Sequence, residues 1–204
     1  METNIYLIRH GQTVWNADRR FQGQSDVALD ESGVAQARLL RERMREVPVD
    51  FIVSSDLIRA RQTAEILAEP HGLEVVEDPA LREIHFGIWE GLPIDEIRRR
   101  DPELFETWRG SPGALRVPEA ETFQEVQDRA AAAFERWAAL YSGKTLVLVS
   151  HGGVISALLC RILNEPIQRM WDYKLENTSV SYVTYHSSTG YRIQFVNDNS
   201  HLVS

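Results

Sequence analysis

The chain has 204 residues, of which 43% are hydrophobic and 25% are charged, a balance typical of a soluble globular domain with a sizeable core. It lacks a membrane-spanning apolar run and a signal-peptide pattern at its N-terminus, so we expect a cytoplasmic protein without membrane contact. The net charge of −8 excludes general nucleic-acid binding, and a lone cysteine, Cys160, excludes an internal disulfide and a Cys-cluster zinc site.

The first half of the chain alternates short β-rich runs with segments whose apolar residues recur every three or four positions. The first pattern predicts strands, and the second, where a capping residue precedes it, predicts helices. The expected elements are a strand over residues 4–9, a polar loop over 11–30, a helix from Asp30 or Ser32 to about Val47, a strand over 51–53, a helix capped by residues 54–56 and ending near Ala68, and a strand over 73–76.

The second half begins with two short helical segments and ends with alternating strands. A Gly-, Ser- and Pro-rich stretch between these parts predicts a loop. The expected elements are short helices over 93–100 and 103–109, the loop over 110–121, a helix from Thr122 to about Tyr141, an apolar strand over 146–149, a helix from Gly152 to about Leu163, and a hairpin of strands over 179–185 and 191–196.

Strands that alternate with helices predict an α/β fold, a three-layer sandwich around a mostly parallel sheet. The C-terminal hairpin adds an antiparallel edge to this sheet. Pairing of two chains at this edge would give a homodimer, an alternative that the sequence leaves open. No internal repeat or long linker divides the chain. We therefore expect one domain over residues 1–204, with residues 87–121 as a lid-like insertion.

Two predicted strands end in histidine, at His10 and His151, and a glycine follows each histidine. Ligands of open α/β sheets bind beyond the carboxyl ends of the strands. The helix predicted from Gly152 adds free N–H groups that favour an anion. Together with Arg9, these groups give an acidic chain a local cluster that attracts an anion such as phosphate.

Four short motifs contain these histidines and two further charged positions. They read Leu7-Ile8-Arg9-His10-Gly11-Gln12-Thr13 followed by Trp15-Asn16, Ser54-Ser55-Asp56-Leu57-Ile58-Arg59-Ala60-Arg61-Gln62-Thr63-Ala64, Leu81-Arg82-Glu83-Ile84-His85-Phe86-Gly87-Ile88-Trp89-Glu90-Gly91, and Val149-Ser150-His151-Gly152-Gly153. In this order they resemble the motifs of the histidine phosphatase superfamily, in its phosphoglycerate-mutase-like branch. The resemblance covers about residues 4–204.

The resemblance implies a phosphoryl-transfer enzyme that uses no metal ion or other cofactor. It implies that His10 is the nucleophile that becomes a phosphohistidine. It also implies that Arg9, Arg59 and His151 bind the phosphoryl oxygens, and that Glu83 acts first as general acid and then as general base. The positions it implies for substrate binding are Asn16, Gln22, Gly23, His85, Gly152 and His201.

Two of these positions have alternative interpretations. His85 either lines the pocket or packs beneath the lid. His201 either returns to the pocket mouth or completes the last strand. The aromatic residues also have two interpretations: they either wall the pocket or, as we expect for most of them, pack in the core or the lid. These residues are Trp15, Phe21, Trp89 and Trp108.

The third motif separates a phosphatase from a mutase. Cofactor-dependent mutases that the motif resembles carry Glu-Arg-His-Tyr-Gly there, whereas this chain has Ile84 in place of the arginine that holds the remaining anionic group of the substrate. We therefore expect a phosphatase that acts on a small phosphorylated metabolite. The alternatives are a cofactor-dependent phosphoglycerate mutase, a protein-tyrosine phosphatase, and a binding protein that has lost catalysis.

Overall fold

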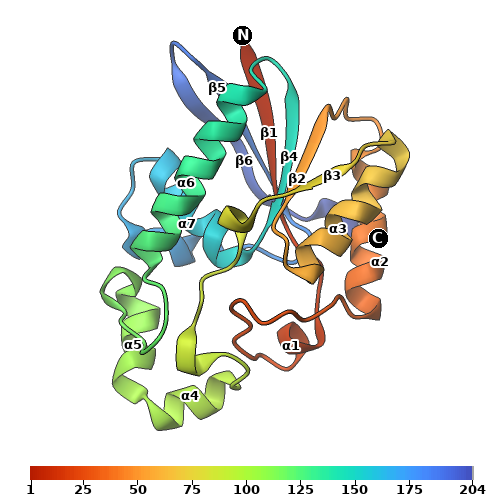
Figure 1. Cartoon of the computed structure of the whole chain (residues 1–204). Coiled ribbons are helices and arrows are strands. Elements are labelled where there is room, and N and C mark those ends of the chain that lie inside the picture. Colours follow the sequence, from red (N-terminus) through yellow and green to blue (C-terminus); the bar gives the residue numbers. More distant parts are fainter. Residues whose placement is uncertain (204) are drawn as a thin grey trace.

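The computed structural model describes residues 1–203 and has a central sheet between two layers of helices (Figure 1). Within these residues the sheet has six strands in the order β3-β2-β4-β1-β5-β6. The strands from β3 to β1 in this order run parallel, and β5 and β6 are antiparallel, which confirms the predicted sheet. The strands are β1 (Glu2–Arg9), β2 (Phe51–Ser54), β3 (Val75–Glu77), β4 (Thr145–Ser150), β5 (Val180–His186) and β6 (Gly190–Asp198).

Helices cover both faces of the sheet, because the side chains of a strand alternate between the faces. Ile8 of β1 and Val149 of β4 pack with Leu40 under α2 and α3, whereas Leu7 and Leu148 pack on the opposite face under α6 and α7. The α-helices are α1 (Val14–Ala17), α2 (Glu31–Met44), α3 (Ile58–Ala68), α4 (Ile94–Arg100), α5 (Pro102–Gly110), α6 (Phe123–Leu140) and α7 (Gly152–Ile162). Of the helices in residues 1–203, none has the length and apolar character that crossing a bilayer requires.

The start of α3 corrects one sequence prediction. Residues 54–56 do not cap this helix: Leu57 is its N-cap residue and makes no side-chain capping bond. The N–H of Ile58 instead donates to the Asp26 carboxylate at 2.7 Å. Asp56 forms an ion pair with Arg82. The predicted cap was wrong because a carboxylate from a distant loop takes its place.

Two other boundaries differ by a few residues from those predicted, and one predicted loop contains a short helix. The helix expected to reach Val47 ends at Met44, and the strand expected over 73–76 is β3, Val75–Glu77. The four residues of α1 interrupt the loop expected over 11–30. A capping box between Thr13 and Asn16 stabilises this short helix.

The segment of residues 87–121 carries α4 and α5 beyond the carboxyl ends of the parallel strands (Figure 1). Its side chains Trp89, Ile97 and Phe105 are buried against Phe123 and Val126, at the start of α6. This apolar cluster fixes the segment to the helices α6 and α7 rather than to the sheet. The segment therefore borders the region where the strands end.

Candidate active site

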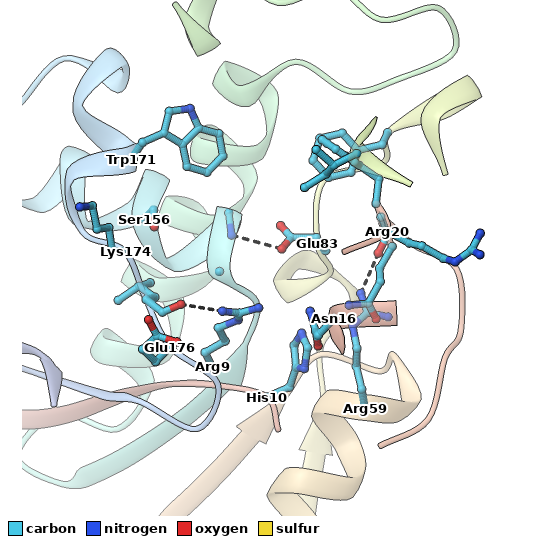
Figure 2. Close-up of a pocket in the computed structure, with 18 of the residues that line it drawn as sticks. Arg9, His10, Asn16, Arg20, Arg59, Glu83, Ser156, Trp171, Lys174 and Glu176 are labelled. Atoms are coloured by element: carbon cyan, nitrogen blue, oxygen red, sulfur yellow. Dashed lines mark hydrogen bonds between the residues drawn. The ribbon is translucent and has the colours of Figure 1, made fainter. Parts of the chain in front are cut away.

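A cavity of about 520 Å³ lies where β1 and β4 end and α7 begins. Figure 2 shows polar and charged side chains that reach it from several elements, among them Arg9, His10, Arg59 and Glu83. Of the residues expected at the site, the ones that line this cavity are Arg9, His10, Asn16, Gln22, Gly23, Arg59, Glu83 and Gly152.

His10 directly follows β1 and is only 3% exposed. Its Nδ1 lies 2.7 Å from the carbonyl oxygen of Gly11. Because that oxygen only accepts, Nδ1 carries the proton and Nε2 carries the lone pair. Burial, reinforced by the charges of Arg59 and Arg9, holds the pKa of His10 well below its usual range. The imidazole is therefore neutral and nucleophilic at neutral pH.

His151 directly follows β4 and is fully buried beneath the cavity. Its Nε2 lies 2.9 Å from the hydroxyl oxygen of Ser55. Burial, and then the charge of Arg59, holds the pKa of His151 well below its usual range. Its Nδ1 is buried and, within residues 1–203, has no hydrogen-bond partner. When the Ser55 hydroxyl donates to Nε2, the ring proton is on Nδ1. Nδ1 can then donate a hydrogen bond to an oxyanion.

Arg59 and Arg9 are held in place by backbone carbonyl groups. Arg59 donates to the carbonyl oxygens of Gly23 at 2.7 Å and Ser25 at 2.8 Å, and Arg9 donates to that of Leu175 at 2.6 Å. Burial lowers the pKa of Arg59 to about 10 and also lowers the pKa of Arg9. The Nε atoms of both arginines are buried and lack a partner in the part of the chain that the structure describes. Such donors are costly to leave unpaired, so these side chains suit an anionic ligand.

Glu83 reaches the cavity from the irregular segment between β3 and α4. Its carboxylate accepts the N–H of Ile84 at 3.0 Å and the N–H of Gly153 at 3.2 Å. Gly153 lies in the first turn of α7, where a side chain would collide with Glu83. The start of α7 thus fixes the carboxylate of a residue that can exchange protons with a bound ligand.

Two expected substrate-binding residues do not line the cavity in the described chain, residues 1–203. The side chain of His85 is 43% exposed, and its Nδ1 lies 2.9 Å from the carbonyl oxygen of Glu119. His201 lies in a turn after β6, where Nε2 is 3.1 Å from Thr178 Oγ1 and Nδ1 is 3.2 Å from Arg43. The structure thus places His201 beside the end of the last strand and His85 against the end of the segment 87–121.

Several residues that the sequence did not single out line the cavity. Most come from positions around the short helix before β5 and from the loop after α1, whereas Ile94 begins α4 and Ser156 lies in α7, and no motif marks them. One available signal was that Lys174 is one of only two lysines in the chain. The asparagine Asn177 brings this segment to the site, because its Nδ2 donates to the His10 carbonyl oxygen at 2.9 Å. The residues are Arg20, Ile94, Ser156, Trp171, Lys174, Leu175 and Glu176.

One wall of the cavity is aromatic and is supported from behind. Phe21 packs edge-on against Phe86 and Trp108, with ring centroids 4.7 and 5.1 Å apart. Trp171 lies 5.3 Å from Trp108 and donates its indole N–H to the Trp108 carbonyl oxygen at 2.8 Å. Trp108 therefore serves both the packing expected for it and the lining of the cavity. These contacts give the cavity a fixed apolar side opposite its charged groups.

Across residues 1–203, no group of three or more His, Cys, Asp or Glu side chains is arranged to hold a metal ion. The groups that face the cavity include hydrogen-bond donors, aromatic side chains and the carboxyl groups of Glu83 and Glu176.

Comparison with known proteins identifies the class of enzyme that this fold and site define. The family model for the histidine phosphatase superfamily (branch 1) matches residues 5–199, so the chain belongs to this superfamily, as its motifs predicted. A relative from Yersinia pestis (strain Pestoides F), named probable phosphoglycerate mutase GpmB, is 41% identical over 207 residues, which cover 97% of this chain and 94% of that protein. The chain is therefore a phosphatase or a mutase of the superfamily.

Solved structures agree with the fold. Bacillus stearothermophilus YhfR has a TM-score of 0.94 and 34% sequence identity, with 98% of this chain and 99% of that chain covered. The mycobacterial glucosyl-3-phosphoglycerate phosphatase has a TM-score of 0.87 and 31% identity, with 97% and 99% covered. These similarities confirm the predicted α/β architecture.

Proposed function

We propose that this enzyme is a phosphatase that hydrolyses small phosphomonoesters through a phosphohistidine on His10, without a metal ion. The observation that carries the proposal is the environment of His10. Its Nδ1 is committed to the Gly11 carbonyl group, and its neutral ring lies among Arg9, Arg59 and His151. Each of these three side chains has one buried nitrogen, Nε of the arginines and Nδ1 of His151, without a partner within residues 1–203. This arrangement supplies a nucleophile and donors for phosphoryl oxygens in one place.

In the first step, Nε2 of His10 attacks phosphorus and the bond from phosphorus to the ester oxygen breaks. Glu83 donates a proton to the departing oxygen, so the product leaves as a neutral alcohol. Arg9, Arg59 and His151 hold the equatorial oxygens and offset the charge that grows on them. The enzyme then carries a phosphohistidine and the Glu83 carboxylate.

In the second step, the Glu83 carboxylate accepts a proton from water as the water oxygen attacks phosphorus. The phosphorus–nitrogen bond breaks, inorganic phosphate leaves, and both His10 and Glu83 return to their starting states. The net reaction is a monoester plus water giving an alcohol plus phosphate. The aromatic wall formed by Phe21, Trp108 and Trp171 supports an alcohol that has an apolar part.

The position of Ile84 favours a phosphatase over a mutase. Ile84 is 1% exposed and packs in the apolar cluster with Phe86 and Trp89, so it offers no group for the second anionic part of a substrate. A mutase stays the second candidate because Lys174 and Arg20 line the cavity and offer positive charge. The name of the Yersinia relative points the same way.

A phosphate-release assay on a panel of monoesters, with and without a chelator, tests this proposal. We expect release without added bisphosphoglycerate, no effect of the chelator, and no measurable turnover by His10→Ala. Rapid quenching should trap an acid-labile, base-stable phosphoenzyme in wild type but not in His10→Ala. Efficient interconversion of the phosphoglycerate isomers with negligible phosphate release would instead identify a mutase, and sensitivity to the chelator would contradict the metal-free mechanism.

A further inference from the structure

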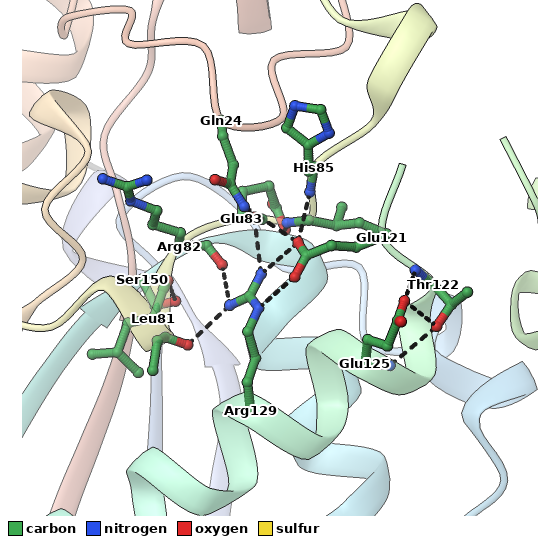
Figure 3. Close-up of polar contacts among 12 residues, drawn as sticks. Gln24, Leu81, Arg82, Glu83, His85, Glu121, Thr122, Glu125, Arg129 and Ser150 are labelled. Atoms are coloured by element: carbon green, nitrogen blue, oxygen red, sulfur yellow. Dashed lines mark hydrogen bonds and ion pairs between the residues drawn. The ribbon is translucent and has the colours of Figure 1, made fainter. Parts of the chain in front are cut away.

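Arg129, on α6, holds three carbonyl groups of the segment that carries Glu83 (Figure 3). Its Nη1 donates to the carbonyl oxygens of Ala80 at 2.9 Å and Arg82 at 2.7 Å, and its Nη2 donates to that of Glu83 at 3.0 Å. The other two bonds go to Glu121: Nε to Oε1 at 2.9 Å and Nη2 to Oε2 at 3.0 Å. All five N–H donors of the guanidinium group are thereby used.

Glu121 holds the same segment from the other side. Its Oε2 also accepts the backbone N–H of His85 at 2.9 Å and the side-chain amide of Gln24 at 3.2 Å. Burial alone would raise the pKa of Glu121, but hydrogen bonds from Arg129 and His85 hold it below its usual range. Glu121 therefore stays a carboxylate at neutral pH and keeps the arginine oriented.

Arg129 and Glu121 are supported by the regular start of α6. Glu121 ends the segment 87–121, and Thr122 begins α6 with a capping box to Glu125. Figure 3 shows Arg129 rising from α6 toward the backbone at residues 81–83. The guanidinium group thus joins a regular helix to an irregular segment.

The segment that contains Glu83 needs such support because residues 82–86 belong to no helix or strand. Backbone groups outside regular structure need partners from elsewhere in the fold. Gln24 provides a second donor to the Glu83 carbonyl oxygen, at 3.2 Å. The carboxylate end of Glu83 is fixed separately by the N–H of Gly153.

We propose that Arg129 and Glu121 are positioning residues for Glu83, which orient its carboxyl group for proton transfer to the leaving oxygen. This inference rests on the proposed function, because it assumes that Glu83 is the general acid. Neither residue lines the cavity in the described chain, so both act through the backbone of Glu83. A displacement of about 1 Å at a reacting group can reduce a rate about a hundredfold.

The dependence of the rate on the leaving group separates this role from a merely structural one. Phenyl phosphate releases a basic phenoxide that needs a proton from the acid, whereas dinitrophenyl phosphate releases an ion that needs none. kcat/KM reports the steps up to release of the alcohol, so it isolates the step in which Glu83 acts as acid. Loss of fold or of phosphate binding lowers the values for both esters, whereas a misplaced acid lowers only the value for phenyl phosphate.

The experiment measures kcat/KM on both esters for wild type, Glu83→Gln, Arg129→Met, Arg129→Lys and Glu121→Gln. For Arg129→Met we expect a loss of about 10- to 100-fold on phenyl phosphate and less than about threefold on dinitrophenyl phosphate. Arg129→Lys should show the same selective loss, because an ammonium group keeps the charge but cannot span three carbonyl groups and a carboxylate. Glu121→Gln should lose less, in the same direction.

Arg136→Met is the matched control on the same helix. Arg136 is an exposed residue of α6 that pairs with Asp78 and makes no contact with Glu83 among the hydrogen bonds of residues 1–203. It should show equal kcat/KM ratios for the two esters relative to wild type. Melting temperatures of all variants report any loss of folding.

The outcomes distinguish the two proposals. If Glu83→Gln is selective for phenyl phosphate but Arg129→Met and Glu121→Gln lose equal factors on both esters, or none, the positioning role is wrong and the proposed function stands. If Glu83→Gln itself shows no selectivity, Glu83 is not the general acid. The role of Glu83 in the proposed function and the positioning role of Arg129 and Glu121 are then both wrong. Should Arg129→Met not fold, Glu121→Gln and Arg129→Lys decide by the same ratio.

Discussion

The imidazole rings of His10 and His151 lie with their centroids 5.1 Å apart and their planes tilted by 59°. Each ring directly follows one of two adjacent parallel strands, paired in register from Asn4 with Thr145 to Arg9 with Ser150. Parallel pairing therefore brings together two residues that are 141 positions apart in the sequence. Two buried imidazoles at this distance beside two arginines are stable only when both are neutral.

We predict that His10 and His151 stay neutral in the free enzyme at pH 6. Burial holds the pKa of both rings below 6.5, and Arg59 lowers them further, so protonation requires a more acidic solution. NMR of ring-labelled histidine, with His10→Ala and His151→Ala to assign the signals, measures this directly. Half-protonation of either ring near pH 6.5 would contradict the prediction.

Gly153→Ala should lower activity without lowering stability. A Cβ atom at this position would lie 2.6 Å from Glu83 Oε1, so the carboxylate must move. Alanine in place of glycine favours a helix by about 1 kcal/mol, so the melting temperature should stay the same or rise. We expect kcat/KM on phenyl phosphate to fall about tenfold or more.

Gly152→Ala is the matched control for that change. Its Cβ atom would lie 3.4 Å from Arg9 Nε, which is an ordinary contact, so the loss of activity should be smaller. Equal activity of Gly153→Ala and wild type would show that the carboxylate does not need the position seen in the structure.

Trp171→Ala should weaken binding of the alcohol part of the substrate. The Trp171 ring lines the cavity away from Arg9 and Arg59, for which we propose contacts to the phosphoryl group. We expect KM for phenyl phosphate to rise about tenfold, which corresponds to the roughly 1.4 kcal/mol of one aromatic contact. The inhibition constant of inorganic phosphate should change less than about twofold, because phosphate lacks the alcohol part. Equal changes in both constants would place Trp171 in the phosphate site instead.

The stability of the protein should depend on His201 between pH 7 and pH 4. Burial, and then Arg43, lowers the pKa of His201 to about 4, so the unfolded chain binds a proton near pH 6.5 that the folded chain does not. The free energy of unfolding therefore falls as the pH falls from 6.5 toward 4. The contribution of this half-buried ring is about 1–2 kcal/mol after allowance for solvent screening.

Urea unfolding of wild type and His201→Gln over this pH range measures that contribution. The glutamine variant should lose less stability than wild type between pH 6.5 and pH 4. Parallel curves for the two proteins would show that His201 does not resist protonation in the fold.

Local patterns in the sequence determined the strands, the helices and the positions of the principal charged residues. Apolar alternation and capping residues are properties of neighbouring positions, so they located the sheet, the C-terminal hairpin and α6. The four motifs identified the superfamily, and they contain His10, Arg59 and Glu83, which line one cavity in the fold. The cap of α3 was missed because its partner, Asp26, is 32 residues away.

Only the tertiary structure decided which residues share the cavity and which stand outside it. Trp171 and Lys174 reach the site through contacts between segments more than 100 residues apart, such as the bond from Asn177 to His10, and no local pattern encodes such contacts. His201 belongs to a motif-like tail, yet Arg43 and Thr178 hold it away from the cavity. The support of Glu83 by Arg129 likewise depends on how a helix packs on an irregular segment, because packing is set by the whole fold and not by the residues beside Glu83.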